Sequence, residues 1–140
     1  FEEVMSMVNE TGLSDQIECD LRYVGENEIP RIFSECDFVV LPYYKTFRAQ
    51  SVVLTLAAQY NRPILSSNVG QNGYDIVKYG LGGVCESESV EGLEHLIEQA
   101  LNGKITVSND SFNNYFKEHS WEMMAKNLIT MYTHKNIIAN

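Results

Sequence analysis

The sequence is poor in cysteine, proline and basic residues. It has 140 residues, of which three are cysteine, three are proline and one is tryptophan, and 19 acidic residues outnumber ten lysines and arginines. Cys19, Cys36 and Cys85 are odd in number, widely spaced and without a CxxC pair. They predict no disulfide framework and no zinc cluster, and we interpret them as three small core residues in a reducing compartment.

Long apolar runs and a secretory leader are absent as well. No stretch reaches the roughly 20 apolar residues that a membrane-spanning helix needs, and no basic, apolar leader indicates a signal peptide. The formal net charge of −9 disfavours general nucleic-acid binding, although amides and one or two cations can still hold a diphosphate. We therefore expect a cytoplasmic protein without a nucleic-acid partner.

What is present is the composition of one globular domain. The hydrophobic fraction is 44% and the charges are mixed, which is typical of a folded domain that spans residues 1–140. No linker, internal repeat or low-complexity segment divides the chain. The chain begins with Phe1, and its first five residues already follow a helical pattern, which predicts a fragment of a longer protein.

Apolar periodicity predicts alternating helices and strands. We expect helices at 1–12, 27–36, 50–60, 74–79, 90–101 and 120–135, and strands at 17–24, 37–41, 63–66 and 83–85. Loops are expected at 43–49, 68–73 and 104–111. Strands that alternate with helices favour right-handed crossovers, so the sequence predicts an α/β fold with a Rossmann-like parallel sheet flanked by helices.

Several elements carry finer expectations. Asn27 is the expected N-cap of the helix at 27–36, with Pro30 in its first turn. The strand at 37–41 and the helix at 50–60 are apolar enough to be buried on nearly all sides. The final helix is expected to turn an apolar stripe inward, namely Trp121, Met124, Ala125, Leu128, Met131 and Tyr132.

The loops after the strands are where this fold binds ligands. Gln50 and Ser51 begin the apolar helix, whose free amides carry partial positive charge, and Lys45 and Arg48 in the preceding loop could neutralise a diphosphate. On these residues alone we favour another interpretation, in which Ser51 only caps the helix and both cations are solvated.

Aromatic and histidine residues leave less specific signals. Tyr43, Tyr44 and Phe47 could stack on a base or sugar, or could equally line a domain interface. The histidines predict no metal site, because they pair with no acid or cysteine at a ligand-like spacing; they are His95, on the outer side of its helix, His119 and His134.

Six segments, taken in order, carry a resemblance to a known family: DFVVLPY at 37–43, QSVVLTLA at 50–57, RPILS at 62–66, NVG at 68–70, YG at 79–80 and SWE at 120–122. The chain resembles, from about residue 13 onward, the C-terminal domain of glycosyltransferase family 4 (glycosyl transferases group 1). The specificity lies in the order and spacing of the segments rather than in any single one.

The resemblance implies the C-terminal half of a GT-B fold, truncated on its N-terminal side. Such a half binds the nucleotide-diphosphate sugar from which the enzyme transfers a sugar, with retention and without metal or cofactor, to a glycan, lipid or polysaccharide. The missing N-terminal Rossmann-like domain of the same chain would bind the acceptor and carry much of the chemistry. This fragment alone would then be inactive, and the full-length enzyme would associate peripherally with the inner face of a membrane.

The resemblance also implies a donor site, and the catalytic residues stay unknown. The expected donor-binding residues are Gly25, Glu26 and Asn27 near the nucleobase, Gln50, Ser51 and the Val52 amide at the diphosphate, and Tyr43, Lys45, Arg48 and Thr55 around them. Many members have two glutamates separated by seven residues where this chain has Arg48 and Leu56. Thr55 is the candidate to replace the ribose contact, and Asp75 is nearest to a third family glutamate. Loss of the glutamates favours an alternative, a non-catalytic α/β interaction module derived from a transferase domain.

Overall fold

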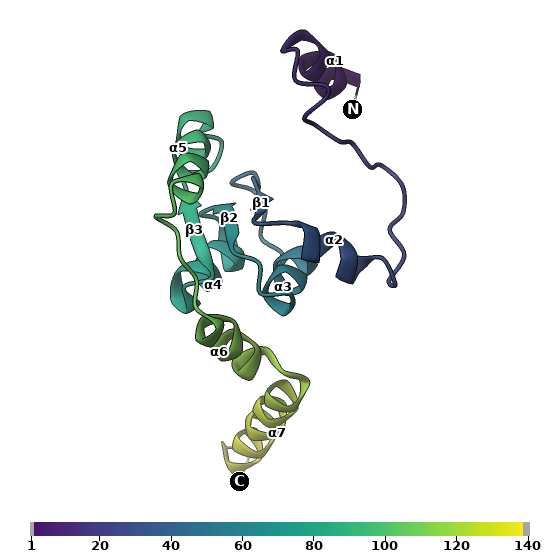
Figure 1. Cartoon of the computed structure of the whole chain (residues 1–140). Helices are drawn as coiled ribbons and strands as arrows, with labels where there is room; N and C mark the ends of the chain where they lie inside the picture. The colour runs from purple at the N-terminus through teal and green to yellow at the C-terminus, as the bar shows by residue number, and fades with distance from the viewer. Residues whose placement is uncertain (1, 139–140) are drawn as a thin grey trace.

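The computed structural model describes residues 2–138 and is a mixed α/β arrangement around a small parallel sheet (Figure 1). Its strands are β1 (Val39–Leu41), β2 (Ile64–Ser67) and β3 (Gly82–Cys85). Its helices are α1 (Glu2–Glu10), α2 (Ile29–Glu35), α3 (Val52–Gln59), α4 (Gly70–Tyr79), α5 (Val90–Leu101), α6 (Asn109–His119) and α7 (Trp121–Ile138). The sheet order is β1-β2-β3 with both pairs parallel, as the alternation of elements predicts.

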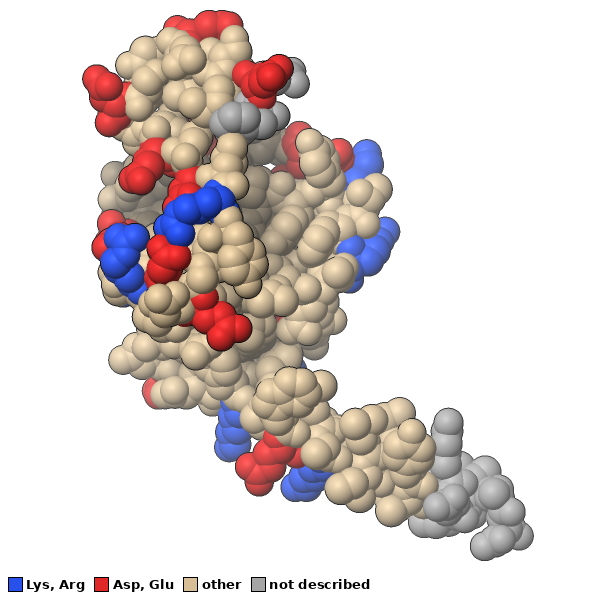
Figure 2. Space-filling model, turned by 90° about the vertical axis from the view of Figure 1, so that its right-hand side faces the viewer, with Lys and Arg blue, Asp and Glu red and all other residues tan. Residues whose placement is uncertain are grey.

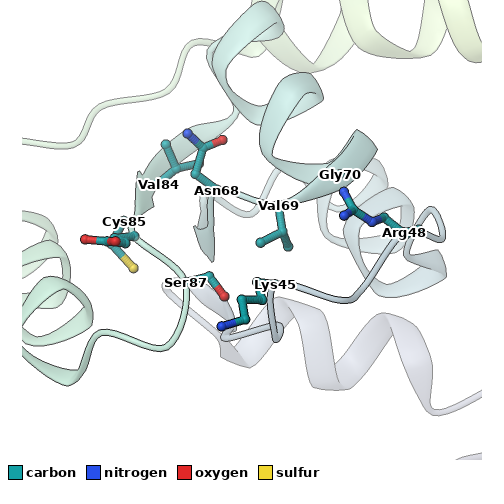
Figure 3. Close-up of a pocket in the computed structure, with 9 residues that line it drawn as sticks. Lys45, Arg48, Asn68, Val69, Gly70, Val84, Cys85 and Ser87 are labelled. Carbon is teal, nitrogen blue, oxygen red and sulfur yellow. The ribbon is translucent and has the colours of Figure 1, made fainter.

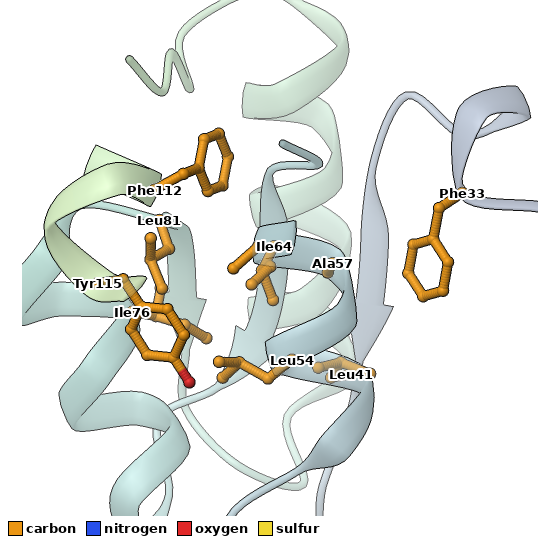
Figure 4. Packing of buried hydrophobic residues seen from close by; sticks show 10 residues of the cluster. Phe33, Leu41, Leu54, Ala57, Ile64, Ile76, Leu81, Phe112 and Tyr115 are labelled. Atoms are coloured by element: carbon orange, nitrogen blue, oxygen red, sulfur yellow. The ribbon is translucent and has the colours of Figure 1, made fainter. Parts of the chain in front are cut away.

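The sheet is covered by different helices on its two faces. Ile64 and Leu65 are consecutive in β2 and therefore point to opposite faces. Ile64 belongs to the larger core with residues of α2, α3, α4 and α6, including Leu54, Ile76 and Tyr115 (Figure 4). Leu65 packs against α5 in a smaller second core. The central strand is thus buried on both faces, because helices cover both.

The expected strand at 17–24 is wrong. This segment forms no strand and pairs with no strand of the described chain, and Leu21 and Tyr23 are 68% and 89% exposed. Its apolar residues alternate with Glu18, Asp20 and Arg22, a pattern that forms a strand only where a neighbouring strand supplies hydrogen bonds. Here the segment passes from α1 to α2 away from the sheet (Figure 1).

Two elements are less buried than their composition predicts. Strand β1 lies at the edge of the sheet and is covered on one face only. Val39 and Leu41 pack into the larger core, whereas Val40, on the other face, is 42% exposed. Helix α3 buries Leu54 and its two alanines but leaves Val52 and Val53 exposed at its first turn. The expectation of burial on nearly all sides is therefore wrong for both elements.

The C-terminal third differs most from the expectation. The sequence pattern predicts no helix at 109–119, yet α6 forms there, capped by Ser108, and its Phe112 and Tyr115 fill the core. In α7 the expected inward stripe is exposed, with Trp121 at 85% and Tyr132 at 70%. Helix α7 packs on α6 and extends away from the sheet (Figure 1), so its apolar side chains have little to pack against.

Smaller corrections concern the starts of helices and one cysteine. Glu28, not Asn27, is the N-cap of α2, while Pro30 does lie in its first turn. Helix α4 begins at Gly70, four residues earlier than the expected Tyr74. All three thiols are free, but Cys19 is exposed rather than part of the core. Among the described residues no helix is long and apolar enough to cross a membrane.

Candidate functional site

A pocket of ≈ 560 Å³ lies at the carboxyl ends of the parallel strands (Figure 3). Three loops form it. Lys45 and Arg48 come from the loop after β1, residues 68–70 from the loop after β2, and residues 84–87 from the end of β3. This is the edge at which parallel α/β sheets bind ligands, so the fold places both predicted cations, Lys45 and Arg48, at the expected edge.

Hydrogen bonds and an ion pair hold the three loops together. The hydroxyl of Ser87 donates to the Tyr43 carbonyl at 3.0 Å, and the amide of Asn68 donates to the Cys85 carbonyl at 2.8 Å. Lys45 Nζ lies 3.3 Å from a carboxylate oxygen of Glu88. The walls of the pocket are therefore joined by contacts between loops that are far apart in the sequence.

The start of α4 contributes to the pocket without a side-chain cap. Val69 is its N-cap and its side chain supplies no capping hydrogen bond. Serines, by contrast, cap α3, α5 and α6 and accept from the Leu54, Gly92 and Ser111 amides. The first amides of an α-helix have no partner within the helix and carry partial positive charge. Among these four helices, the uncapped one begins beside Lys45 and Arg48.

Gly70 allows the cationic loop to approach α4 closely. Its φ is +51°, and a Cβ at this position would lie 3.0 Å from the Phe47 carbonyl oxygen and 3.5 Å from Arg48 Cα. A side chain here would therefore be strained and would displace the loop that carries Arg48. The glycine of the NVG segment is needed for this contact.

Ser51 does not offer its hydroxyl to a ligand. It is 5% exposed, its Oγ accepts from the Leu54 amide at 3.3 Å, and the same oxygen lies 2.7 Å from the Tyr43 hydroxyl. Its own amide donates to Asn72 Oδ1 at 2.9 Å. These contacts agree with the interpretation in which Ser51 caps the helix.

Gln50 and Thr55 form an internal hydrogen-bond network. Gln50 Nε2 donates to the Tyr115 hydroxyl at 3.1 Å, and Thr55 Oγ1 lies 3.3 Å from the same oxygen. Both contacts join the start of α3 to α6. Neither residue lines the pocket, although both lie near it along the chain.

Of the three aromatic residues in the loop after β1, two stack on each other and one is exposed. Tyr43 and Phe47 stack on each other with ring centroids 4.1 Å apart and planes at 6°. Tyr44 is 71% exposed and lines a second cavity beside the first one. Tyr44 is therefore the aromatic ring of this loop that a ligand could cover.

The residues expected near a nucleobase lie outside the pocket. Gly25, Glu26 and Asn27 precede α2 on the segment that passes from α1 to α2 away from the sheet, and none of them lines the cavity. Arg22 donates to Glu28 at 2.7 Å, and this hydrogen bond lowers the pKa of the Glu28 carboxyl to about 2. The Val52 amide lies at the exposed start of α3, also outside the lining of the pocket.

Of the residues that line the pocket, only Lys45 and Arg48 are predicted as site residues by the sequence, and Cys85 and Asn72 are two further residues that matter to the site. Cys85 lines the pocket, and its burial raises the pKa of the thiol, so it is protonated at neutral pH and is a poor nucleophile. Asn72 is fully buried, accepts from the Ser51 amide and donates to the Ala49 carbonyl at 3.3 Å. It thereby fixes the loop of Arg48 to α4, and a single asparagine within a helical segment gives no sequence signal for this role.

The histidines differ in their surroundings. His95 is exposed, as expected, and the side chain of His134 lies outside the described part of the structure. His119 Nε2 lies 3.7 Å from Asp75 Oδ2, an acid 44 positions earlier that sequence spacing does not reveal. Among the described residues no three His, Cys, Asp or Glu side chains are placed to hold a metal ion.

Comparisons of this chain with family models, with curated proteins and with solved structures found no match. The resemblance to glycosyltransferase family 4 therefore rests on the sequence segments. The geometry of the pocket is the independent observation that bears on function.

Proposed function

We propose that this chain is the donor-binding part of a glycosyltransferase and holds the diphosphate of a nucleotide-diphosphate sugar in the pocket at the carboxyl edge of the sheet. One observation carries the proposal. Lys45, Arg48 and the uncapped start of α4 surround a single pocket where three parallel strands end. The order and spacing of the family-like segments support the same function.

The charges around the pocket suit a diphosphate. Lys45 and Arg48 contribute two positive charges, and the helix start adds partial positive charge. Glu86 is the acidic residue of the lining, and Glu88 pairs with Lys45 beside it, so Arg48 and the helix start are the positive groups without an acidic partner in the lining. Its volume of ≈ 560 Å³ is within the usual range for small-molecule sites. In glycosyl transfer such groups would stabilise the negative charge that develops on the leaving diphosphate.

In this proposal the chain forms the C-terminal half of a GT-B fold. An N-terminal Rossmann-like domain of the same protein would bind the acceptor, a glycan, lipid or polysaccharide, and would be needed for transfer with retention. The fragment alone would bind the nucleotide but not turn it over. Peripheral association with a membrane would then be a property of the full-length enzyme.

Nucleotide binding to defined variants tests the proposal. Ligand-observed NMR with UDP, GDP, ADP and inorganic phosphate should show binding with a Kd on the order of millimolar, since half of a two-domain site is present. Arg48→Ala and Lys45→Ala should each weaken binding roughly threefold to tenfold. Lys104→Ala, which removes the same charge from an exposed residue outside the pocket, is the matched control. No binding, or equal binding to all variants, would refute the pocket assignment.

Variants of Ser51 are unsuited to this test, because Ser51 is buried and caps α3. A replacement by arginine would disturb the fold and the site together. Cysteine alkylation gives a second measurement on the unmodified chain instead. At alkaline pH, where part of the Cys85 thiol is ionised despite its raised pKa, bound nucleotide should slow the alkylation of Cys85 by iodoacetamide but not that of exposed Cys19.

A second candidate is a non-catalytic interaction module derived from a transferase domain. Exposed apolar side chains on α1 and α7 favour it, among them Met7 at 62% and Trp121 at 85% exposure. It is also favoured by the internal hydrogen bonds of Gln50, Ser51 and Thr55, which the donor site was expected to use. The nucleotide titration separates the two functions, because an interaction module would bind none of the nucleotides.

A further inference from the structure

Asp75 is a carboxylate inside the protein, and one of its two oxygens has no donor. The residue lies in the middle of α4 and is 1% exposed. Gln71 Nε2 donates to its Oδ1 at 2.8 Å, whereas its Oδ2 is buried and accepts no hydrogen bond within the described part of the chain. Burial of a carboxylate is costly unless a partner compensates its charge, so Asp75 needs a donor or a cation on the side of Oδ2.

The imidazole of His119, at the end of α6, faces this oxygen. Its Nε2 lies 3.7 Å from Asp75 Oδ2, and its Nδ1 lies 2.8 Å from the carbonyl oxygen of Tyr115. Because a carbonyl oxygen can only accept, Nδ1 carries a proton. In a neutral imidazole Nε2 would then be an acceptor too, and two acceptors would face each other inside the protein.

One further proton on this pair removes the conflict. On Nε2 it makes His119 an imidazolium at ion-pair distance from the Asp75 carboxylate. Two features of α6 favour that form. The last carbonyls of a helix carry partial negative charge, and His119 is the last residue of this one. The Tyr115 ring stacks on the imidazole with centroids 4.2 Å apart, which also favours a cation there.

Other ionisable groups near His119 are already paired or lie elsewhere. Lys78 and Tyr79 of α4 donate to the carboxylate of Glu118, at 2.8 and 2.6 Å. Helix α3 and strand β2 contain no ionisable residue. The remaining ionisable side chains on the nearest parts of β3, α6 and α7 form no ion pair with His119 or Asp75 in the described chain; they are Cys85, Lys117, Glu122 and Lys126. Asp75 is therefore the carboxylate that the imidazole faces without competition.

The pair joins the two helices that hold the start of α3. Asn72 of α4 accepts from the Ser51 amide at 2.9 Å, and the Tyr115 hydroxyl of α6 accepts from Gln50 Nε2 at 3.1 Å. Each of these partners lies about one turn before a member of the pair on the same helix. A change in the contact between the pair should therefore reach the start of α3, beside the pocket.

We propose that Asp75 and His119 form a proton-dependent clamp between α4 and α6. While the pair holds the additional proton, an ion pair joins the two helices. Loss of that proton as the pH rises leaves the carboxylate opposite a bare ring nitrogen, and the two groups separate. The clamp thereby makes the position of Tyr115, and with it that of Gln50, depend on pH. The inference is independent of the proposed function, because no nucleotide takes part.

NMR of the imidazole nitrogens tests the clamp on the unmodified chain. Two-bond ¹H–¹⁵N spectra distinguish a protonated ring nitrogen from a bare one, and His119→Gln identifies the signals of His119. At about pH 7.5, roughly one unit above the ordinary titration range of histidine, His119 should have two protonated nitrogens and exposed His95 only one. A bare Nε2 in His119 at this pH would overturn the proposal without any variant.

Three variants identify the carboxylate that holds the proton. Asp75→Asn keeps the shape of the side chain, and its amide can donate to a bare Nε2, so His119 should lose one ring proton at about pH 7.5. Glu98→Gln is the matched control, since it removes a carboxylate 4.0 Å from His95, and it should leave His119 unchanged. Glu118→Gln should leave both ring protons as well. If it removes one and Asp75→Asn does not, the proposal is wrong.

The same titration measures how far the clamp acts. Between about pH 6 and 9 the side-chain amide signal of Gln50 should move with the midpoint of His119, and it should stay still in Asp75→Asn. Gln99 is the internal control: its amide lies 2.8 Å from His95 and should follow that ring instead. A Gln50 signal that does not move while His119 titrates would overturn the link between the clamp and the start of α3.

Discussion

At the scale of single residues, hydrogen bonds rather than position along the chain decide which groups are free to bind a ligand. Ser51 and Val69 both precede helices at the carboxyl edge of the sheet. The serine hydroxyl caps its own helix, so the polar residue is occupied. The valine offers no cap, so the helix that follows it keeps free amides at the pocket.

Ser51→Ala should destabilise the protein. The change removes the cap from the Leu54 amide and the partner of the Tyr43 hydroxyl, which together should lower the free energy of unfolding by about 1–2 kcal/mol. Urea denaturation followed by circular dichroism measures the change, with Val52→Ala at the next, exposed position as the control. Equal midpoints for the two variants would contradict the assigned cap.

At the scale of elements, the sheet and its crossing helices depend on close approaches and on a few polar contacts. Gly82 in β3 lies against β2, where an added Cβ would come within 1.9 Å of the Ile64 carbonyl oxygen.

A second contact joins α4 to α6 through Lys78, Tyr79 and Glu118. Both Lys78 and Tyr79 donate to the same carboxylate oxygen, at 2.8 and 2.6 Å.

Gly82→Ala should disrupt the pairing of β2 with β3. Because the atom that a Cβ would meet is backbone, the strands must separate, and we expect a loss of roughly 3 kcal/mol or more in unfolding free energy. Gly103→Ala is the control, since its φ is +70° but no atom lies within 4 Å of the added Cβ. That variant should cost only about 1 kcal/mol. Similar losses in both would show that the contact with Ile64 is not limiting.

The contact between α4 and α6 should make stability depend on pH on the acidic side. Hydrogen bonds from Lys78 and then Tyr79 lower the pKa of Glu118 below its ordinary value of 4.5. A lowered carboxyl pKa adds stability that is present above that value and is lost as the pH falls through the lowered pKa. Glu118→Gln should therefore lower the urea midpoint slightly at pH 7, and the difference should shrink progressively as the pH falls below 4.5.

The matched control for this measurement is Glu94→Gln, which removes an exposed carboxylate from α5. Its midpoint should equal that of the unmodified protein at pH 7 and throughout the acidic range. A Glu118→Gln effect that persists at low pH would show that the residue acts through packing and not through its charge. The effect should also shrink at high salt, because the ion pair is solvent-exposed.

At the scale of the whole molecule, the folded body lies between two exposed ends. The buried apolar residues all fall between Phe33 and Tyr115 within the described chain. Helices α1 and α7 lie at opposite ends of the molecule, and α7 protrudes with a largely uncharged surface (Figures 1 and 2). These exposed apolar ends are the feature that the interaction-module alternative would use.

Removal of residues 121–140 should leave the body folded. Helix α7 packs on α6, and none of its residues with a described side chain, 121–133, is fully buried, so the free energy of unfolding should change by less than about 1 kcal/mol. Binding of the dye ANS, which reports exposed apolar surface, should decrease in the shortened chain. Loss of the cooperative urea transition would mean that α7 is required for folding.

The sequence by itself determined the features that depend on neighbouring residues. Apolar runs and periodicity predicted the parallel order of strands and helices around 37–101, and the start of α3 followed from the capping serine at Ser51. The same local patterns located the carboxyl edge, and with it Lys45 and Arg48, as the place of a candidate site.

The tertiary structure decided which of these groups are buried, paired or free. The partner of the Ser51 amide is Asn72, 21 residues away, and the partner of Gln50 is Tyr115, 65 residues away. The segment at 17–24 has an alternating pattern but no strand beside it, and α7 has an apolar surface but little to cover it. Periodicity and caps are set within a few residues of the chain, whereas burial and hydrogen-bond partners are supplied by distant ones, and so only the folded chain fixes them.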